Sequence, residues 1–246
     1  MSVPLLGAGL AVDVLPFTPA SISGLQLWLD ASDSGTLFQN SNGTTAAAAD
    51  GDPVGYWGDK SGNNWNLVQS DGSKKPAIKL SIKNGRSVVR FDGTNDFFRN
   101  TTINSNLQTS LRTIFVVARS LNANFGCIYI VNNTLILSQA SVTGTYYDVN
   151  ASNFVLPAVQ NYYVFVAKSA GVGLKASYIV NGSSSALFSS NQTSPSGNAT
   201  VDIGSLNVGS FPFGGDLLEV LHYSDALSDG NINLIRNYLN NKWSIY

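Results

Sequence analysis

About ten short runs rich in apolar residues, separated by Gly, Asn, Asp and Pro, dominate the chain, and each predicts a β-strand. The clearest is Leu25–Asp30, with the sequence LQLWLD. Its apolar and polar residues alternate, as the side chains of a strand do between the two faces of a sheet. The other runs span residues 55–58, 87–91, 113–118, 127–131, 134–138, 145–149, 162–168, 176–180, 199–203 and 217–223. So many short, closely spaced strands predict an all-β sandwich or barrel.

The composition supports this and excludes some partners. Charged residues make up 12% of the 246 residues, about half the usual share, and 23 glycines accompany many Asn, Ser and Thr. The formal net charge is −1, and the longest basic run is Lys74-Lys75, so we expect no nucleic-acid partner. The single cysteine, Cys127, lies in an apolar run and is predicted to be buried.

The first 23 residues differ from the rest. Pro4, Pro16 and Pro19 with scattered glycines predict an extended N-terminal arm over 1–23, followed by one domain over 24–246. No Lys or Arg precedes the apolar residues, and Asp13 interrupts them, so this segment is a poor signal peptide and too short for membrane insertion. We expect it to attach the domain to other proteins or to copies of itself. The proposed assembly residues are Leu5, Leu6, Leu10, Val14 and Phe17.

Three further segments carry local signals. Ser228 is a plausible helix N-cap, and Ile232, Ile235, Leu239 and Trp243 then form one apolar stripe, which predicts a C-terminal amphipathic helix. Asn181-Gly182 predicts a hairpin turn, because both residues tolerate a positive φ. Residues 31–54 are predicted to form a long loop.

Several segments, in order, resemble the laminin-G-like, concanavalin-A-like jelly-roll modules of bacteriophage structural and bacterial surface proteins. They are residues 25–33 (LQLWLDASD), 54–63 (VGYWGDKSGN), 84–93 (NGRSVVRFDG) with Asp96, 113–117 (TIFVV), and 215–220 (GDLLEV) through Leu227-Ser228 to Tyr238-Leu239 and Lys242-Trp243. The resemblance covers residue 24 to the end. It implies an antiparallel two-sheet β-sandwich with one C-terminal helix. Such folds host lectins, glucanases and structural modules alike, so function needs its own argument.

The residues needed for catalysis are scarce. Concanavalin-like glucanases use a pair of carboxylates on one strand, whereas this chain has one glutamate, Glu219. Its one histidine, His222, has no Gly-x-Ser-x-Gly partner, and one His with one Cys is too few for a zinc site. We therefore predict a non-catalytic protein that requires no cofactor.

The segment Phe91-Asp92-Gly93-Thr94-Asn95-Asp96 has two readings. The Asp and Asn side chains can cap a tight turn by accepting hydrogen bonds from nearby amides. Alternatively, because laminin-G-like modules often hold calcium at the sandwich rim, Asp92, Asn95 and Asp96 could supply its oxygen ligands.

Glycan binding needs aromatic rings beside amide groups. The run Asn63-Asn64-Trp65 and the ring of Tyr147 are the candidates, although each aromatic could equally belong to the core.

The favoured function is that of a virion structural protein, either a head decoration, a head fibre or a tail fibre or tip module. It would be made in the host cytoplasm and displayed on the virion surface, attached through its N-terminal arm to other virion proteins or to copies of itself. The alternative is a lectin-like adhesion module, extracellular or on a cell surface, that binds cell-surface glycans.

Overall fold

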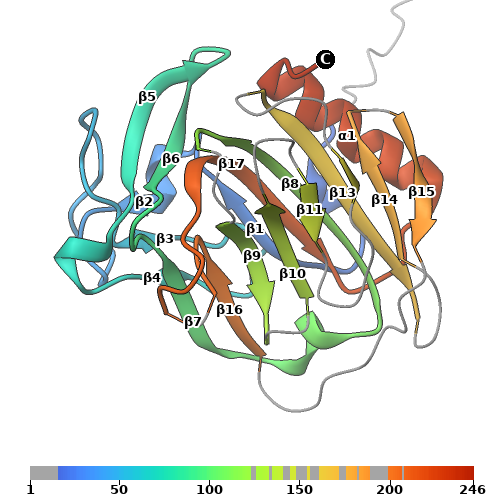
Figure 1. Ribbon diagram of the computed structural model, residues 1–246, viewed down its shortest axis with the longest axis horizontal. Helices are drawn as coiled ribbons and strands as arrows, with labels where there is room; N and C mark the ends of the chain where they lie inside the picture. The colour runs from blue at the N-terminus through green and yellow to red at the C-terminus, as the bar shows by residue number, and fades with distance from the viewer. Residues whose placement is uncertain are drawn as a thin grey trace, which may run out of the picture.

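A computed structural model describes residues 16–122, 126–132, 135–140, 145–147, 154–155, 161–171, 176–181, 183–188, 199–206 and 208–246. Two antiparallel sheets lie face to face, and one helix covers the outer side of the first sheet (Figure 1). The two-sheet sandwich with a C-terminal helix is therefore confirmed.

The first sheet has the order β15-β14-β13-β8-β17-β6-β5, and β1 also pairs with β17. Its strands are β1 (Leu25–Asp30), β5 (Ala77–Lys83), β6 (Arg86–Asp92), β8 (Leu111–Ser120), β13 (Tyr163–Ala170), β14 (Ala176–Val180), β15 (Ser183–Phe188) and β17 (Gly214–Tyr223). Every residue of the central strand β17 is buried. On one side it pairs along its length with β8, and on the other with β6 and then β1.

The second sheet has the order β12-β11-β10-β9-β16-β7-β4-β3-β2. Its strands are β2 (Leu37–Phe38), β3 (Tyr56–Trp57), β4 (Leu67–Val68), β7 (Phe98–Ile103), β9 (Gly126–Val131), β10 (Leu135–Ala140), β11 (Thr145–Tyr147), β12 (Phe154–Val155) and β16 (Ala199–Ile203). Short 3-10 helices cover Pro19–Ser21, Ser34–Thr36, Gly72–Lys74 and Ser105–Gln108.

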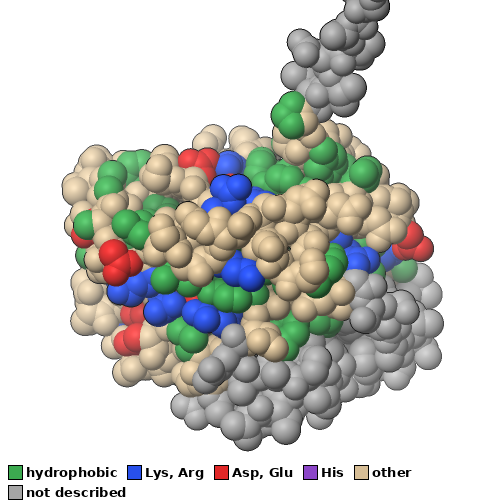
Figure 2. All heavy atoms as spheres, turned by 90° about the horizontal axis from the view of Figure 1, so that it is seen from above, with side chains coloured by type: hydrophobic (Ala, Val, Ile, Leu, Met, Phe, Trp, Pro, Cys, Tyr) green, Lys and Arg blue, Asp and Glu red, His purple; other side chains and the backbone are tan. Residues whose placement is uncertain are grey.

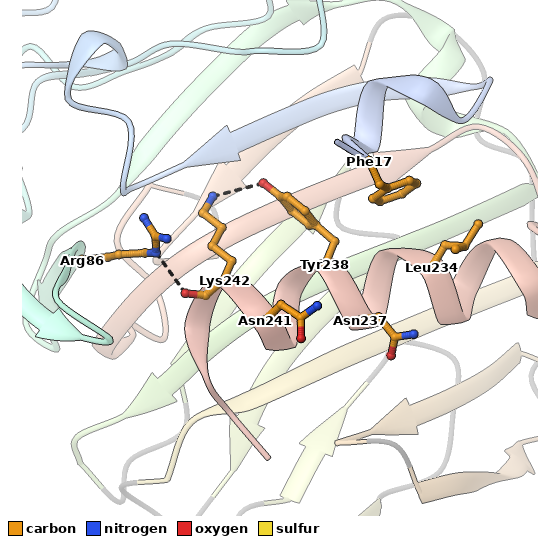
Figure 3. Close-up of a pocket in the computed structure, with 7 residues that line it drawn as sticks. All are labelled: Phe17, Arg86, Leu234, Asn237, Tyr238, Asn241 and Lys242. Atoms are coloured by element: carbon orange, nitrogen blue, oxygen red, sulfur yellow. Dashed lines mark hydrogen bonds between the residues drawn. The ribbon is translucent and has the colours of Figure 1, made fainter. Parts of the chain in front are cut away.

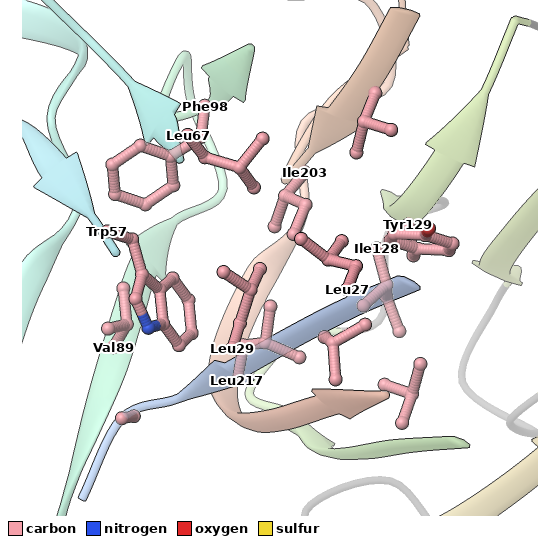
Figure 4. Close-up of a cluster of buried hydrophobic side chains, with 14 of the residues drawn as sticks. Leu27, Leu29, Trp57, Leu67, Val89, Phe98, Ile128, Tyr129, Ile203 and Leu217 are labelled. Atoms are coloured by element: carbon pink, nitrogen blue, oxygen red, sulfur yellow. The ribbon is translucent and has the colours of Figure 1, made fainter. Parts of the chain in front are cut away.

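The main core lies between the sheets (Figure 4). Four aromatic rings of this core contact one another in the order Trp57, Phe98, Phe91 and Phe213, with neighbouring centroids about 6 Å apart. Such tilted and edge-to-face pairs are favourable beyond the area that they bury. Cys127 is buried as predicted.

A second core lies between the outer face of the first sheet and α1 (Asp229–Trp243). Ser228 caps the helix by accepting a hydrogen bond from Asn231 N at 3.3 Å, as predicted. The predicted stripe is also confirmed, because Ile232, Ile235, Leu239 and Trp243 are all buried. Burying each aliphatic side chain contributes about 1.5–3 kcal/mol, which fixes the helix's rotation and leaves its opposite face outward.

Some expectations differ from the structure. The segment 31–54, expected as loop, contains β2 and a 3-10 helix, and Ala47 and Val54 are buried. No strand was expected over β5 or β7. The sequence of β7, FRNTTI, is mostly polar, which masks the alternation, whereas that of β5, AIKLSIK, does alternate and was overlooked. The Asn181 hairpin is confirmed, with Val180 opposite Ser183 and a positive φ at Asn181, whereas Gly182 lies outside the described residues. Residues 134, 148 and 149 of two predicted strands also lie outside them.

Candidate functional site

A hollow of about 530 Å³ opens beside the outward face of α1 (Figure 3). Five of its lining positions lie on the helix, and each is three or four residues from another, so they share one face. The hollow, called the helix-face hollow below, is lined by Phe17, Arg86, Leu234, Asn237, Tyr238, Asn241 and Lys242. Because the buried stripe sets the helix's rotation, the fold itself presents these side chains outward.

Two aromatic rings form part of the lining. Phe17 and Tyr238 are half-buried and meet edge to face, with centroids 6.0 Å apart and an interplanar angle of 64°. The Tyr238 hydroxyl donates a hydrogen bond to Glu219 Oε1 at 3.2 Å. Burial and the neighbouring Glu219 raise the pKa of Tyr238, so it stays protonated. The hydroxyl is thus held inward, and the ring is fixed at the hollow.

A buried carboxylate anchors this arrangement from below. Glu219 is fully buried and accepts hydrogen bonds from Trp28 Nε1 at 2.8 Å, Trp243 Nε1 at 2.6 Å and Lys242 Nζ at 2.8 Å. Lys242 Nζ also lies 2.7 Å from Asp30 Oδ1. The positive charge of Lys242 is therefore neutralised beneath the hollow.

The tip of the β5–β6 hairpin forms one end of the hollow. Arg86 Nε and Asn84 Nδ2 each donate a hydrogen bond of 2.9 Å to the carbonyl of Lys242. These bonds satisfy a helix-end carbonyl. Within the described residues, Asn237 and Asn241 have exposed side chains that make no hydrogen bond, so their amides are available to a ligand.

A second hollow of about 540 Å³, the rim hollow, lies at one end of the sandwich. It is lined by Ser73, Lys75, Ala77, Lys79, Arg90, Phe91, Asp92, Asp96, Leu121, Asn122 and Gly214. Burial raises the pKa of Asp96 to about 6.

The predicted calcium residues lie together in one turn, where their carboxylates accept hydrogen bonds from backbone amides of the turn. Asp92 Oδ1 accepts hydrogen bonds from Thr94 N at 2.7 Å and Asn95 N at 3.2 Å. Asp96 Oδ2 accepts one from Asp92 N at 2.8 Å. Calcium prefers six to eight oxygens, and much of this small set already caps the turn. In the described parts of the chain, no cluster of three or more His, Cys, Asp or Glu side chains could hold a metal. Calcium binding at Asp92, Asn95 and Asp96 stays a prediction.

The predicted glycan residues do not line the helix-face hollow, and they lie in the segment between β3 and β4 and at the end of β11. Trp65 is 9% exposed and belongs to the main core, so its ring offers little face to a sugar. Asn63 donates to the carbonyl of Gln26 at 2.9 Å, whereas Asn64 is exposed with φ of 59°. Tyr147 ends β11, and its side chain lies outside the described residues. Their role in binding stays a prediction.

Of the predicted arm, the structure describes only the last residues. Phe17 packs against the second core and lines the helix-face hollow. Pro19 and Ile22 are buried, and Tyr223 donates a hydrogen bond of 2.9 Å to the Pro19 carbonyl. Leu5, Leu6, Leu10 and Val14 lie outside the described residues, so assembly through them stays a prediction.

The candidate acid–base groups are enclosed. Asp30 and Glu219 face each other on β1 and β17 but are 3% and 0% exposed. His222 Nδ1 lies 2.7 Å from the Tyr129 hydroxyl, and burial lowers the pKa of His222 well below its ordinary value. None of these groups can reach a substrate in this arrangement, and the absence of catalysis stays a prediction.

Sequence reasoning missed Asn237, Asn241 and Arg86. The helix stripe was recognised, so its opposite face could have been searched for paired amides. The contact of Arg86 with the helix end could not have been found in this way, because 156 residues separate it from Lys242.

Comparison of the structure with known structures finds β-sandwich domains. Domain 4 of AbnA, an extracellular arabinanase of Geobacillus stearothermophilus in complex with arabinotriose, matches with a TM-score of 0.58 and 10% identity. The match covers 86% of this chain and 98% of that domain. The shared β-sandwich fold is clear.

Two larger proteins match over part of their length. Trypanosoma rangeli sialidase in complex with sialic acid has a TM-score of 0.58 and 13% identity, with 92% of this chain covering 35% of that one. The binding domain of botulinum neurotoxin DC in complex with SialylT has a TM-score of 0.51 and 13% identity, with coverages of 88% and 52%. This chain thus spans about a third to a half of those proteins. No family model and no curated protein matches the sequence. No helix of the described residues is long and apolar enough to cross a membrane.

Proposed function

We propose that this protein is a carbohydrate-binding domain and that the helix-face hollow is its glycan site. The observation that carries the proposal is the placement of two half-buried aromatic rings, Phe17 and Tyr238, beside the unbonded amides of Asn237 and Asn241. A pocket with an apolar surface and a few placed polar groups is the usual form of a small-ligand site.

The chemistry of these groups suits a sugar. The apolar C–H face of a pyranose can pack on an aromatic ring while its hydroxyls point sideways. Each Asn amide both donates and accepts, so it can bond to two neighbouring hydroxyls. The part of the Arg86 guanidinium not bound to the Lys242 carbonyl adds further donors at one end. Leu234, 49% exposed, extends the apolar floor.

The proposal takes up the lectin-like alternative from the sequence. The three structures named above have sugar ligands in their descriptions, which makes glycan binding compatible with the fold without assigning it to this chain. None of the three is described as a virion protein, so the virion role stays a prediction. A glycan-binding domain would act outside the cell, at a cell surface or on a virion that meets one.

The test is a glycan array with the full chain and with the double variant Asn237→Ala/Asn241→Ala. Both positions are exposed, and Ala favours a helix, so the variant should fold. Losing two amides that each contribute about 1 kcal/mol should weaken binding at least about tenfold. Asn233→Ala, also exposed on α1 but outside the hollow, is the matched control and should bind as the wild type does.

Two results would refute the proposal. One is a wild-type chain that binds no glycan, and the other is a double variant that binds as well as the wild type. Repeating the array with calcium and with a chelator tests the predicted calcium site separately, since the helix-face hollow does not include Asp92, Asn95 or Asp96.

A further inference from the structure

Six of the 14 Lys and Arg residues lie on or beside the β5–β6 hairpin and the end of β8. They are Lys75, Lys79, Lys83, Arg86, Arg90 and Arg119, and we call them the cationic track. Lys and Arg side chains gather in a band on the molecular face shown in Figure 2. A chain with a formal net charge of −1 therefore has a local excess of positive charge.

Strand pairing places these residues in order. On the hairpin, Lys83 is opposite Arg86, and Lys79 is opposite Val88. Across the central strand, Asp216 pairs with Arg90 on one side and Arg119 on the other, so the three form one row.

Tyr162 connects the hairpin to β8. Lys83 Nζ lies 5.2 Å from the centroid of its ring, and the Arg119 guanidinium lies 4.5 Å away. The Tyr162 hydroxyl donates to Asp216 at 3.0 Å. Cations over an aromatic ring are attracted by its electron-rich face, which holds them close together despite their repulsion.

The track joins the two hollows. Arg86 lines the helix-face hollow, whereas Lys75, Lys79 and Arg90 line the rim hollow. Lys79, Arg90 and Arg119 keep 29%, 30% and 21% of their side chains exposed, so a ligand can reach them.

The carboxylates beside the track do not cancel it. Asp216 pairs with Arg90 and Arg119, and Asp50 pairs with Lys79 at 3.3 Å. Asp92 and Asp96 lie in the rim hollow. Six cations thus face four carboxylates. Among the described residues, Lys83 and Arg86 have no carboxylate partner.

We propose that the cationic track binds an acidic glycan, a chain of sugars bearing carboxylate or sulfate groups, that extends from the helix-face hollow past Tyr162 toward the rim hollow. This inference rests on the proposed glycan site and specifies the class of its ligand. Charge complementarity selects acidic over neutral sugars, and Arg forms bidentate bonds with planar carboxylates.

Calorimetric titration of the full chain can test it, with a galacturonate decamer and its full methyl ester as probes. Dextran sulfate and unmodified dextran form a second pair that separates sulfate from carboxylate recognition. We expect the acidic member of at least one pair to bind more than tenfold tighter than its neutral counterpart, and its affinity to fall with added salt.

The variant Lys83→Gln/Arg86→Gln should weaken acidic binding about tenfold, since each lost exposed ion contact is worth up to about 1 kcal/mol. Lys168→Gln makes the same kind of charge change near the other end of α1, where Lys168 pairs with Asp229, and should have no effect.

Equal affinity for acidic and neutral probes would overturn the inference and leave the proposed function standing. Inorganic polyphosphate bound as tightly as the acidic glycans would also overturn it, because the track would then attract any polyanion. Binding of no saccharide at all would refute the proposed function together with the inference.

Discussion

The carboxylate of Asp216 is the most heavily bonded charge on the outer face of the first sheet, and removing it gives a sharp test of the fold. It is fully buried and accepts hydrogen bonds from Arg90, Arg119 and the Tyr162 hydroxyl. These partners come from β6, β8 and the residue before β13. Asp216 thus ties three segments to the central strand.

The substitution Asp216→Asn keeps the size and removes the charge. An amide has one acceptor oxygen, so at least one arginine must face an N–H group instead. Breaking a buried ion pair costs about 3–5 kcal/mol, but these arginines are 30% and 21% exposed and can turn toward water. We therefore expect the free energy of unfolding to fall by about 2–3 kcal/mol.

Urea denaturation at pH 7, followed by tryptophan fluorescence, measures this change. Asp229→Asn is the matched control, because Asp229 is 92% exposed and its contact with Lys168 is 3.4 Å long. That variant should lose less than about 0.5 kcal/mol. If Asp216→Asn loses no more than Asp229→Asn, the carboxylate does not hold the strands together and the reasoning is wrong.

Three other predictions concern the rim and the core. Burial raises the folded-state pKa of Asp96 to about 6. Between about pH 4 and pH 6 the folded protein therefore keeps a proton on this carboxyl that the unfolded chain loses, and the stability of the fold decreases as the pH rises through this range. Asp96→Asn keeps an acceptor for the Asp92 N–H, so the variant should be more stable than the wild type by up to about 3 kcal/mol at pH 7 and no more stable below pH 4. Urea titrations at several pH values measure the free energy of unfolding of both proteins, and a difference that does not change with pH would contradict this prediction. Trp65→Ala should cost about 3–5 kcal/mol in the same assay, because the indole belongs to the core, whereas a sugar platform would lose binding with little change in stability. Gly204→Ala should lower the melting temperature strongly, since Gly204 has a φ of 89° and an added Cβ would overlap the Phe91 ring; an unchanged melting temperature would show that the ring can move aside.

Local sequence patterns were sufficient to predict some of the strands, the hairpin turn and the helix. The alternation in Leu25–Asp30 and the stripe from Ile232 to Trp243 depend only on which side chains face the core. The hairpin at Asn181 depends only on the backbone freedom of its turn. Strand β7 was missed because its sequence FRNTTI is mostly polar, and its pairing with β16 and β4 is what makes it a strand.

The candidate site depended on the tertiary structure. The sequence determined that the chain forms a sandwich with one amphipathic helix, because hydrophobic periodicity is a local property. It also placed Trp65 among polar neighbours, which left both a surface and a core position open. In the structure those neighbours fold into a turn, and the ring belongs to the main core. Phe17, Arg86 and Tyr238 lie far apart in the chain and meet only because α1 packs across the first sheet. Packing between distant segments decided where the aromatic rings, amides and cations gather, and no local pattern contains that information.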